Sequence, residues 1–323
     1  MNAARARFVA GLFISAVALY FLFRGLDAGA LVQAWQRLSG TGLSVALLML
    51  AAGYSLRIVR WWWMLRAFDA RVRVADCATP FLASIALNNV LPFRAGDAVR
   101  AFGFQRQLGI PASRVLGTVL IERLLDLTML LVFFFAGAAA VPSRMLPPGM
   151  AMGASIVAVA AGGVLVALPF AGPWLARIMA DSVQGARKLK PWQSKLRDGA
   201  AGLLESFALL RSGRRAAVLL PLTVLIWGFE GAVFATVAAD LASTSSALGA
   251  WFAMATGTLA TLLPSTPGYV GTFDYFTMLG LSAFGASREV ATAFSLCVHA
   301  ILWAPLTAAG LALFALHGGM TAF

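Results

Sequence analysis

The sequence is poor in charge, cysteine and histidine, and each shortage excludes a class of protein. Only 12% of its residues are charged whereas 60% are hydrophobic, so it is not a water-soluble domain wrapped around one core. Its two cysteines, Cys77 and Cys297, both lie in apolar segments, which argues against a disulfide framework and redox chemistry. No metal-ligand spacing, nucleophile elbow or phosphate loop is present, so we expect no metal and no cofactor.

Acidic residues are also scarce, with 13 Asp and Glu against 25 Lys and Arg, which gives a formal net charge of +12. The basic residues stand in short segments beside hydrophobic runs rather than in one folded basic patch. This pattern is typical of membrane topology, in which Lys and Arg gather on the cytoplasmic side. We therefore expect no nucleic-acid partner.

Long apolar runs are what the chain does have. Lipid offers the backbone no hydrogen-bond partner, and these runs are continuous rather than alternating, which favours helices over a barrel. We predict an all-α polytopic membrane protein, a single membrane domain over 1–323, with about six full transmembrane helices. The predicted spans are 8–23, 43–63, 115–141, 150–171, 217–239 and 289–316. The first is interpreted as a retained helix, because no small-residue cleavage pattern follows it.

Two further apolar runs, 77–91 and 247–263, are too short to cross a membrane as helices. About 15 residues at ~1.5 Å each do not cover the roughly 30 Å of a hydrocarbon core. Each run is followed by a returning segment, 94–108 or 272–284, so we predict two re-entrant helical hairpins. The predicted hinge residues are Pro92, Gly96, Pro264, Pro267, Gly268 and Gly271.

The two halves of the chain echo each other. Pro92 and Gly96 repeat the spacing of Pro264 and Gly268, and both pairs close a short apolar run. We therefore predict a first repeat over 43–141 and a second over 216–316. The basic segment 174–215 between them is predicted to be a cytoplasmic amphipathic connector lying against anionic headgroups.

Charge counting gives an orientation in which both termini are cytoplasmic. With the amino terminus inside, the basic cluster from Arg57 to Arg73 and the connector also face the cytoplasm. The first hairpin then enters from the cytoplasmic side and the second from the outside. Such an inverted-topology repeat is typical of transporters, whose site lies between the halves near the midplane.

Charged and amide side chains concentrate in and after the first hairpin. Because such groups are costly near hydrocarbon, they are expected to face a cavity, a partner or a substrate. The candidate substrate-binding residues are Asn88, Asn89, Arg94, Asp97, Arg100, Glu122, Arg123, Asp126, Glu230, Ser265 and Asp274. Helical spacing predicts Arg94, Asp97, Arg100 and Arg106 along one side of a helix, and lets Arg123 pair with Glu122 or Asp126.

Three polar features leave alternatives open. Glu122, Arg123 and Asp126 form either an internal ion pair that fixes packing or the lining of a substrate path. Glu230 is either protonated or paired with an arginine from the first half. His299 is either a packed hydrogen-bond partner or a proton relay.

The residue types favour an anionic substrate. Helix ends near Pro92 and Pro264 are expected to expose backbone groups, and amino-terminal ends favour anions. Arg94, Arg100 and Arg123 can grip a phosphate in a fork. We therefore expect a lipid headgroup to pass through a polar seam between the hairpins while its acyl tails stay in the bilayer. In this interpretation Glu230 and Asp126 receive a cationic group or a proton.

The segments LNNVLPFRAGDAVRAFGFQRQLGI, VLGTVLIERLLDL and LPSTPGYVGTFDYF resemble signatures of the lysylphosphatidylglycerol synthase transmembrane (flippase-like) family. The resemblance implies a multi-pass protein of the bacterial inner membrane that moves envelope lipids, such as aminoacylated phosphatidylglycerol or polyprenyl-phosphate sugars. The chain departs from the pattern at Asp97 and Asp274, where glutamate is expected, and at His299, where a Tyr-Arg pair is common. No soluble aminoacyl-transfer domain follows Phe323, so we expect a stand-alone member that does not make the aminoacyl lipid.

The leading interpretation is a lipid flippase, not an enzyme. One alternative is a membrane lipid-modifying enzyme that transfers a glycosyl or phosphate group, with Glu122, Asp126 or Glu230 as acid or base. The other is a non-transporting accessory protein for an envelope lipid enzyme. A phospholipid or polyprenyl-phosphate lipid is the expected partner, and a separately encoded synthase and a homodimer stay open.

Overall fold

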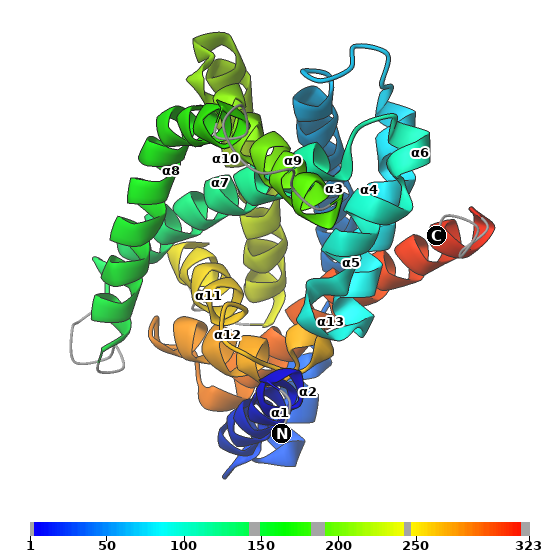
Figure 1. Ribbon diagram of the computed structural model, residues 1–323. Helices are drawn as coiled ribbons and strands as arrows, with labels where there is room; N and C mark the ends of the chain where they lie inside the picture. The colour runs from blue at the N-terminus through cyan, green and yellow to red at the C-terminus, as the bar shows by residue number, and fades with distance from the viewer. Residues whose placement is uncertain (1–2, 142–148, 182–190, 242–246, 318–323) are drawn as a thin grey trace.

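The computed structural model of this protein describes residues 3–141, 149–181, 191–241 and 247–317, and these are built from helices without a strand (Figure 1). The long helices are α1 (Ala3–Phe23), α3 (Gly40–Leu65), α7 (Ala112–Ala138), α8 (Met150–Asp181), α10 (Gly213–Leu241) and α13 (Arg288–Leu316). Within the described ranges, three helices are long and apolar enough to cross a membrane, or up to five if each bent pair is one span. The all-α polytopic architecture is confirmed, while the number of full spans stays a prediction.

A short helix, α2 (Ala28–Trp35), lies between the predicted spans 8–23 and 43–63. Asp27 caps it, because its carboxylate accepts the backbone N–H of Gly29 at 2.8 Å. The chain bends by 91° between α1 and α2. This turns α2 onto α13, against which it packs.

The helices α3 and α10 form an antiparallel pair at the centre of the fold. Asp240, near the end of α10, accepts hydrogen bonds from the Ser39 backbone and hydroxyl at 2.9 and 2.8 Å, at the start of α3. Farther along the pair, Arg60 of α3 donates a hydrogen bond to the Thr223 hydroxyl of α10. Gly53 lies between these points, and its missing side chain lets Phe229 approach the α3 backbone closely.

The first helical hairpin consists of α4 (Val74–Val90), a 3₁₀ turn (Pro92–Arg94), α5 (Ala95–Ala98), a π turn (Val99–Gly103) and α6 (Gln105–Leu108). Its arms are antiparallel, because Gln107 at the far end donates to the Asp76 carbonyl at 3.0 Å. Near the tip a Cβ on Gly96 would lie 2.0 Å from the Ser84 carbonyl oxygen, so glycine is required there. The π turn and the tip break the single helical face on which the sequence placed Arg94, Asp97, Arg100 and Arg106; that expectation is wrong.

The second helical hairpin consists of α11 (Ala247–Ala260), a 3₁₀ turn (Pro267–Tyr269) and α12 (Thr272–Ser282). Its arms lie side by side (Figure 1), and the Thr256 hydroxyl donates to the Phe276 carbonyl at 3.0 Å. Gly280 makes this approach close, since a Cβ there would lie 2.6 Å from the Ala253 Cα.

The two hairpins begin at opposite ends of the α3–α10 pair, because each follows the carboxyl end of one of these antiparallel helices. Their tips meet: Arg94 donates to the Thr261 hydroxyl at 3.4 Å. Opposite entry with meeting tips is the arrangement that an inverted repeat requires. Which membrane face each end contacts stays a prediction, as do the repeat boundaries.

The predicted connector 174–215 is divided among several elements. Residues 174–181 continue α8, residues 182–190 lie outside the described residues, and α9 (Pro191–Ser206) and a 3₁₀ turn (Phe207–Arg211) lead to α10. Through Gly117 and Ser206, α9 packs tightly on α7, so part of the connector lies against the helical body. Residues 142–148, between the predicted spans 115–141 and 150–171, also lie outside the described residues.

Candidate substrate-binding site

A cavity of about 420 Å³ lies between the two hairpins and is walled by α3, α7, α10 and α13. Its lining residues with polar side-chain groups are Tyr54, Arg57, Arg60, Asn88, Asn89, Arg94, Arg100, Glu122, Arg123, Asp126, Trp227, Glu230, Thr258, Thr261, Tyr269, His299 and Trp303. Five arginines face three carboxylates there, so the lining carries an excess of positive charge. This volume falls in the range of about 300–1,000 Å³ that is typical of small-molecule sites.

A smaller cavity of about 240 Å³ lies at the hairpin tips themselves. It is lined by Asn88, Leu91, Pro92 and Arg94 from the first tip and by residues 261–269 from the second. Six residues line both cavities, namely Asn88, Arg94, Thr261, Leu262, Gly268 and Tyr269. The two tips therefore separate neighbouring polar spaces.

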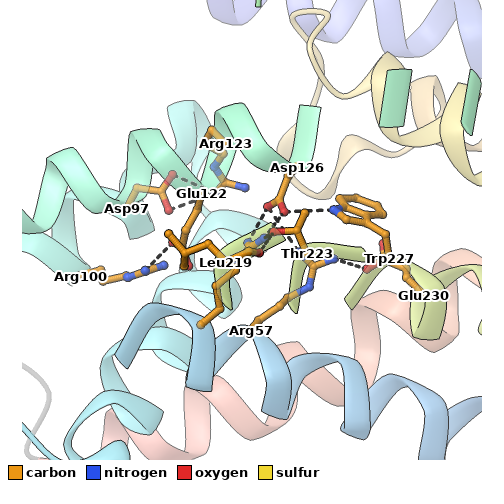
Figure 2. Close-up of polar contacts among 11 residues, drawn as sticks. Arg57, Asp97, Arg100, Glu122, Arg123, Asp126, Leu219, Thr223, Trp227 and Glu230 are labelled. Carbon is orange, nitrogen blue, oxygen red and sulfur yellow. Dashed lines mark hydrogen bonds and ion pairs between the residues drawn. The ribbon is translucent and has the colours of Figure 1, made fainter. Parts of the chain in front are cut away.

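Asp126 on α7 is the most heavily bonded carboxylate of the site (Figure 2). It receives two hydrogen bonds from Arg60, at 2.8 and 3.1 Å, and one from the Trp227 indole N–H at 3.0 Å. Arg57 lies 3.5 Å from its second oxygen. These four N–H donors together replace the hydrogen bonds that the Asp126 carboxylate loses when it is removed from water.

Glu230 on α10 is held by Arg57 on α3, whose Nη2 lies 2.5 Å from the carboxylate. Of the two alternatives for Glu230, the structure shows pairing with an arginine of the first half. The Arg57 guanidinium also lies 4.8 Å from the centroid of the Trp227 ring, within cation–π range. Asp126 and Glu230 thus both have internal cations, rather than being left for a substrate group.

The sequence placed Arg57 and Arg60 in a basic cluster at the cytoplasmic face, and that expectation is wrong. The structure leaves them only 9% and 1% exposed. They point from α3 into the helix body because carboxylates of α7 and α10 lie opposite them. Their position inside the apolar run 43–63 was the signal that could have indicated burial.

Arg100 and Glu122 form an enclosed ion pair at 2.6 Å. The Arg100 guanidinium lies 3.8 Å from the Trp61 ring centroid and 4.6 Å from that of Phe81. Arg100 is only 2% exposed, so little of it is available to a ligand. We therefore interpret Arg100 as a residue that fixes the first hairpin against α3 and α7.

Arg123 pairs with Asp97 of the first hairpin, with Nη2 at 3.1 and 3.3 Å from the two carboxylate oxygens. The prediction that Arg123 pairs with Glu122 or Asp126 is therefore wrong. Asp97 reaches it from the hairpin and is oriented by the Asn88 amide, which donates at 2.9 Å. The Arg123 side chain is still 40% exposed and lines the main cavity.

Arg94 differs from the other four cavity arginines, because it makes no ion pair with any carboxylate in the described part of the chain. Besides the Thr261 hydroxyl, it faces the Tyr269 ring, whose centroid lies 5.6 Å from the guanidinium carbon. Its backbone is left-handed, with φ of 53°. The tip thus presents a cation that no carboxylate of the described residues neutralises.

The second tip is stabilised by its own residues. Asp274 accepts the Gly271 backbone N–H at 2.9 Å and lies 2.7 Å from Nδ1 of His299. The Asp274 carboxylate thus binds the N–H of Gly271, the residue before α12, while the expectation that backbone groups are exposed near Pro264 stays a prediction. At the first tip, Asn89 donates to the Thr307 hydroxyl of α13 at 2.9 Å.

Most of the predicted site residues come together. Asn88, Asn89, Arg94, Arg100, Glu122, Arg123, Asp126 and Glu230 line the main cavity, whereas Ser265 lines the smaller one. Asp97 and Asp274 stand behind the lining and position their neighbours. Of the hinge residues, Pro92, Pro264, Pro267 and Gly268 line the smaller cavity, and Gly96 and Gly271 provide close packing. Besides Arg57 and Arg60, sequence reasoning missed Tyr54 and Trp227.

Known proteins similar to this chain agree with the architecture. Residues 8–310 match the family described as the lysylphosphatidylglycerol synthase TM region. A curated relative, "Glycosyltransferase AglD" of Haloferax volcanii, is 25% identical over 92% of this chain and 52% of that protein. The chain thus spans about half the length of this relative. Because the family match covers nearly all of its helices, this chain belongs to the lysylphosphatidylglycerol synthase transmembrane-region family.

Proposed function

We propose that this protein moves an anionic lipid headgroup across the bilayer, and that the main cavity between the hairpins binds the headgroup. The observation that carries the proposal is Arg94, an arginine without a carboxylate partner among the described residues, facing the same cavity as the half-exposed Arg123. Arg94 is partly buried, and a cation partly removed from water is stabilised when an anion joins it. A phosphate group would supply that anion, bound in a fork by the two guanidinium groups.

The surroundings of the cavity support a lipid rather than a free anion. Exposed apolar side chains stand at both tips, namely Val90, Leu91, Leu262, Leu263 and Val270. The polar space has the size of a small-molecule site, so a headgroup fits while acyl chains stay outside among these side chains. A phospholipid and a polyprenyl-phosphate lipid share this phosphate chemistry.

The test measures lipid movement in proteoliposomes with fluorescent phosphatidylglycerol and dithionite quenching. Losing a charge-assisted hydrogen bond costs ~1.5–3 kcal/mol, so Arg94→Gln and Arg123→Gln should each slow the initial rate about 10- to 100-fold. The matched control is Arg71→Gln, whose side chain is 91% exposed and pairs only with Asp69 outside the cavity. An Arg94→Gln rate equal to that of the wild type would contradict the proposal.

We further propose that the lipid leaves chemically unchanged. This bears on the glycosyltransferase alternative that the name of the relative suggests. Glu122, Asp126 and Glu230 each accept a hydrogen bond from an arginine, so each carboxylate is engaged in an internal ion pair. Recovery of radiolabelled polyprenyl-phosphate sugar unaltered after movement supports this, and a new labelled product would favour the enzyme. The same assay with a co-purified synthase tests the accessory alternative.

A further inference from the structure

His299 on α13 bridges two groups of the second hairpin. Its Nδ1 lies 2.7 Å from Oδ1 of Asp274, and its Nε2 lies 3.0 Å from the Gly268 carbonyl oxygen. A carbonyl oxygen only accepts, so Nε2 must carry a hydrogen. Nδ1 then either carries a second proton or accepts one from a protonated Asp274 carboxyl. Both arrangements hold one proton more than a neutral histidine beside an aspartate.

We propose that the Asp274–His299 pair is a proton-binding site that couples lipid movement to proton transfer. The inference rests on the proposed function, because the coupled process is that movement. Asp274 is only 1% exposed and its other oxygen is fixed by the Gly271 N–H, so the carboxylate cannot turn away. His299 lines the main cavity, which gives the proton a route to the pair.

Loss of the proton removes one of the two hydrogen bonds of the histidine. A neutral imidazole has a single N–H, and the charged carboxylate is the stronger acceptor, so the Gly268 carbonyl loses its partner. Gly268 lies in the tip turn and lines both cavities. Deprotonation therefore releases the part of the second hairpin that separates the two polar spaces, which is where a headgroup would pass.

Titratable groups on several helices surround the Asp274–His299 pair. The titratable groups that line the same cavity are Tyr54, Arg57 and Arg60 on α3, Glu122, Arg123 and Asp126 on α7, Glu230 on α10, Arg94 and Arg100 of the first hairpin, and Tyr269 of the second. The other titratable residues of the packed helices are Arg5, Arg7 and Tyr20 on α1, Asp76 and Cys77 on α4, Arg114 on α7, Arg214, Arg215 and Asp240 on α10, Tyr275 on α12, and Arg288, Glu289 and Cys297 on α13, while α2 and α11 carry none.

The proton is observable without any lipid assay, because the chain has two histidines, His299 and His317. In the His317→Gln variant, ¹⁵N-labelled histidine reports His299 alone by NMR. At low pH, we expect the ¹⁵N signals of His299 to show a hydrogen on Nε2. These signals should change as the pH rises to 9. A neutral histidine with its hydrogen on Nδ1 across the whole range would overturn the proton site. This outcome is independent of whether Arg94→Gln slows lipid movement.

Coupling is tested with Asp274→Asn in proteoliposomes carrying a pH gradient. The carboxamide can accept from Gly271 and donate to Nδ1 of His299, so it keeps the three hydrogen bonds without a removable proton. For one proton per lipid at zero membrane potential, each pH unit should shift the wild-type lipid distribution about tenfold, and Asp274→Asn should show no shift. A full shift in Asp274→Asn, or none in the wild type, would overturn the coupling. If this variant does not fold, the proposal is still tested by the NMR titration of His299 and by the lipid distribution of the wild type under a pH gradient.

Discussion

Arg94 and Tyr269 stack across the junction of the two hairpin tips, with the guanidinium carbon 5.6 Å from the ring centroid. They are also the two non-glycine residues with positive φ in the described part of the chain, at 53° and 60°. Left-handed backbone is unfavourable for such residues and persists where the surroundings impose it, often at functional sites. One strained residue from each half therefore meets its counterpart at the proposed headgroup site.

Replacing the Tyr269 ring should weaken this junction. Tyr269→Leu removes the aromatic face, and because cation–π contacts contribute ~0.5–2 kcal/mol, we expect lipid movement to slow about 2- to 30-fold. Tyr269→Phe keeps the ring and should retain most of the rate. The comparison is made with the fluorescent lipid assay. Equal rates in the two variants would mean that the ring is not used.

The Asp126 network should be essential for folding. Asp126→Asn leaves Arg60 buried without its carboxylate, and breaking a buried pair typically costs ~3–5 kcal/mol, so the melting temperature in detergent should fall sharply. The control is Asp69→Asn in the exposed loop after α3. Arg71 hydrogen bonds hold the pKa of Asp69 at about 2, but this solvated pair should leave the melting temperature nearly unchanged. Similar melting curves for the two variants would contradict the role of Asp126.

Arg100 and Glu122 should behave as a structural unit rather than as ligands. Each single change, Arg100→Met or Glu122→Leu, leaves one buried charge alone and should cost ~3–5 kcal/mol of stability. The double variant should regain most of that loss and move lipid at close to the wild-type rate. A stable double variant without lipid movement would instead assign Arg100 to the substrate.

Gly96 should be irreplaceable at the close approach of the first hairpin arms. A Cβ there meets the Ser84 carbonyl at 2.0 Å, so Gly96→Ala should destabilise by ~1–3 kcal/mol or more. Gly162 on α8 is the matched control, because nothing lies within 4 Å of its added Cβ. Gly162→Ala should be neutral or slightly stabilising in the helix. Thermal melting of both variants in the same detergent makes the comparison.

Because the two hairpins begin at opposite ends of the α3–α10 pair, we predict that cysteines placed at their starts are labelled from opposite sides of the membrane. Arg71 precedes the first hairpin and Ala247 begins the second, and both are exposed. Arg71→Cys should react with an impermeant maleimide from the cytoplasmic side and Ala247→Cys from the outside. The native Cys77 and Cys297 are buried, which keeps the background low. Labelling of both from one side would exclude the inverted repeat.

Several structural features could be predicted because they depend on local sequence. The all-α architecture follows from continuous apolar runs, and the hairpins follow from runs too short to cross that end near Pro92 and Pro264. The gathering of polar residues around one cavity was also predictable, because charges avoid lipid and seek each other. Arg57 and Arg60 were misplaced, since charge counting treats every arginine near a helix end as a surface residue.

The sequence by itself determined the helices, the breaks between them and which residues are too polar for lipid, because hydropathy and backbone hydrogen bonding act within a segment. Only the tertiary structure decided which charges are partners. Arg60 reaches Asp126 across 66 residues and Arg57 reaches Glu230 across 173, and helical spacing carries no information about such separations. Packing α3 against α7 and α10 paired these arginines with carboxylates and left Arg94 without one among the described residues, since ion pairs form wherever side chains from different helices converge.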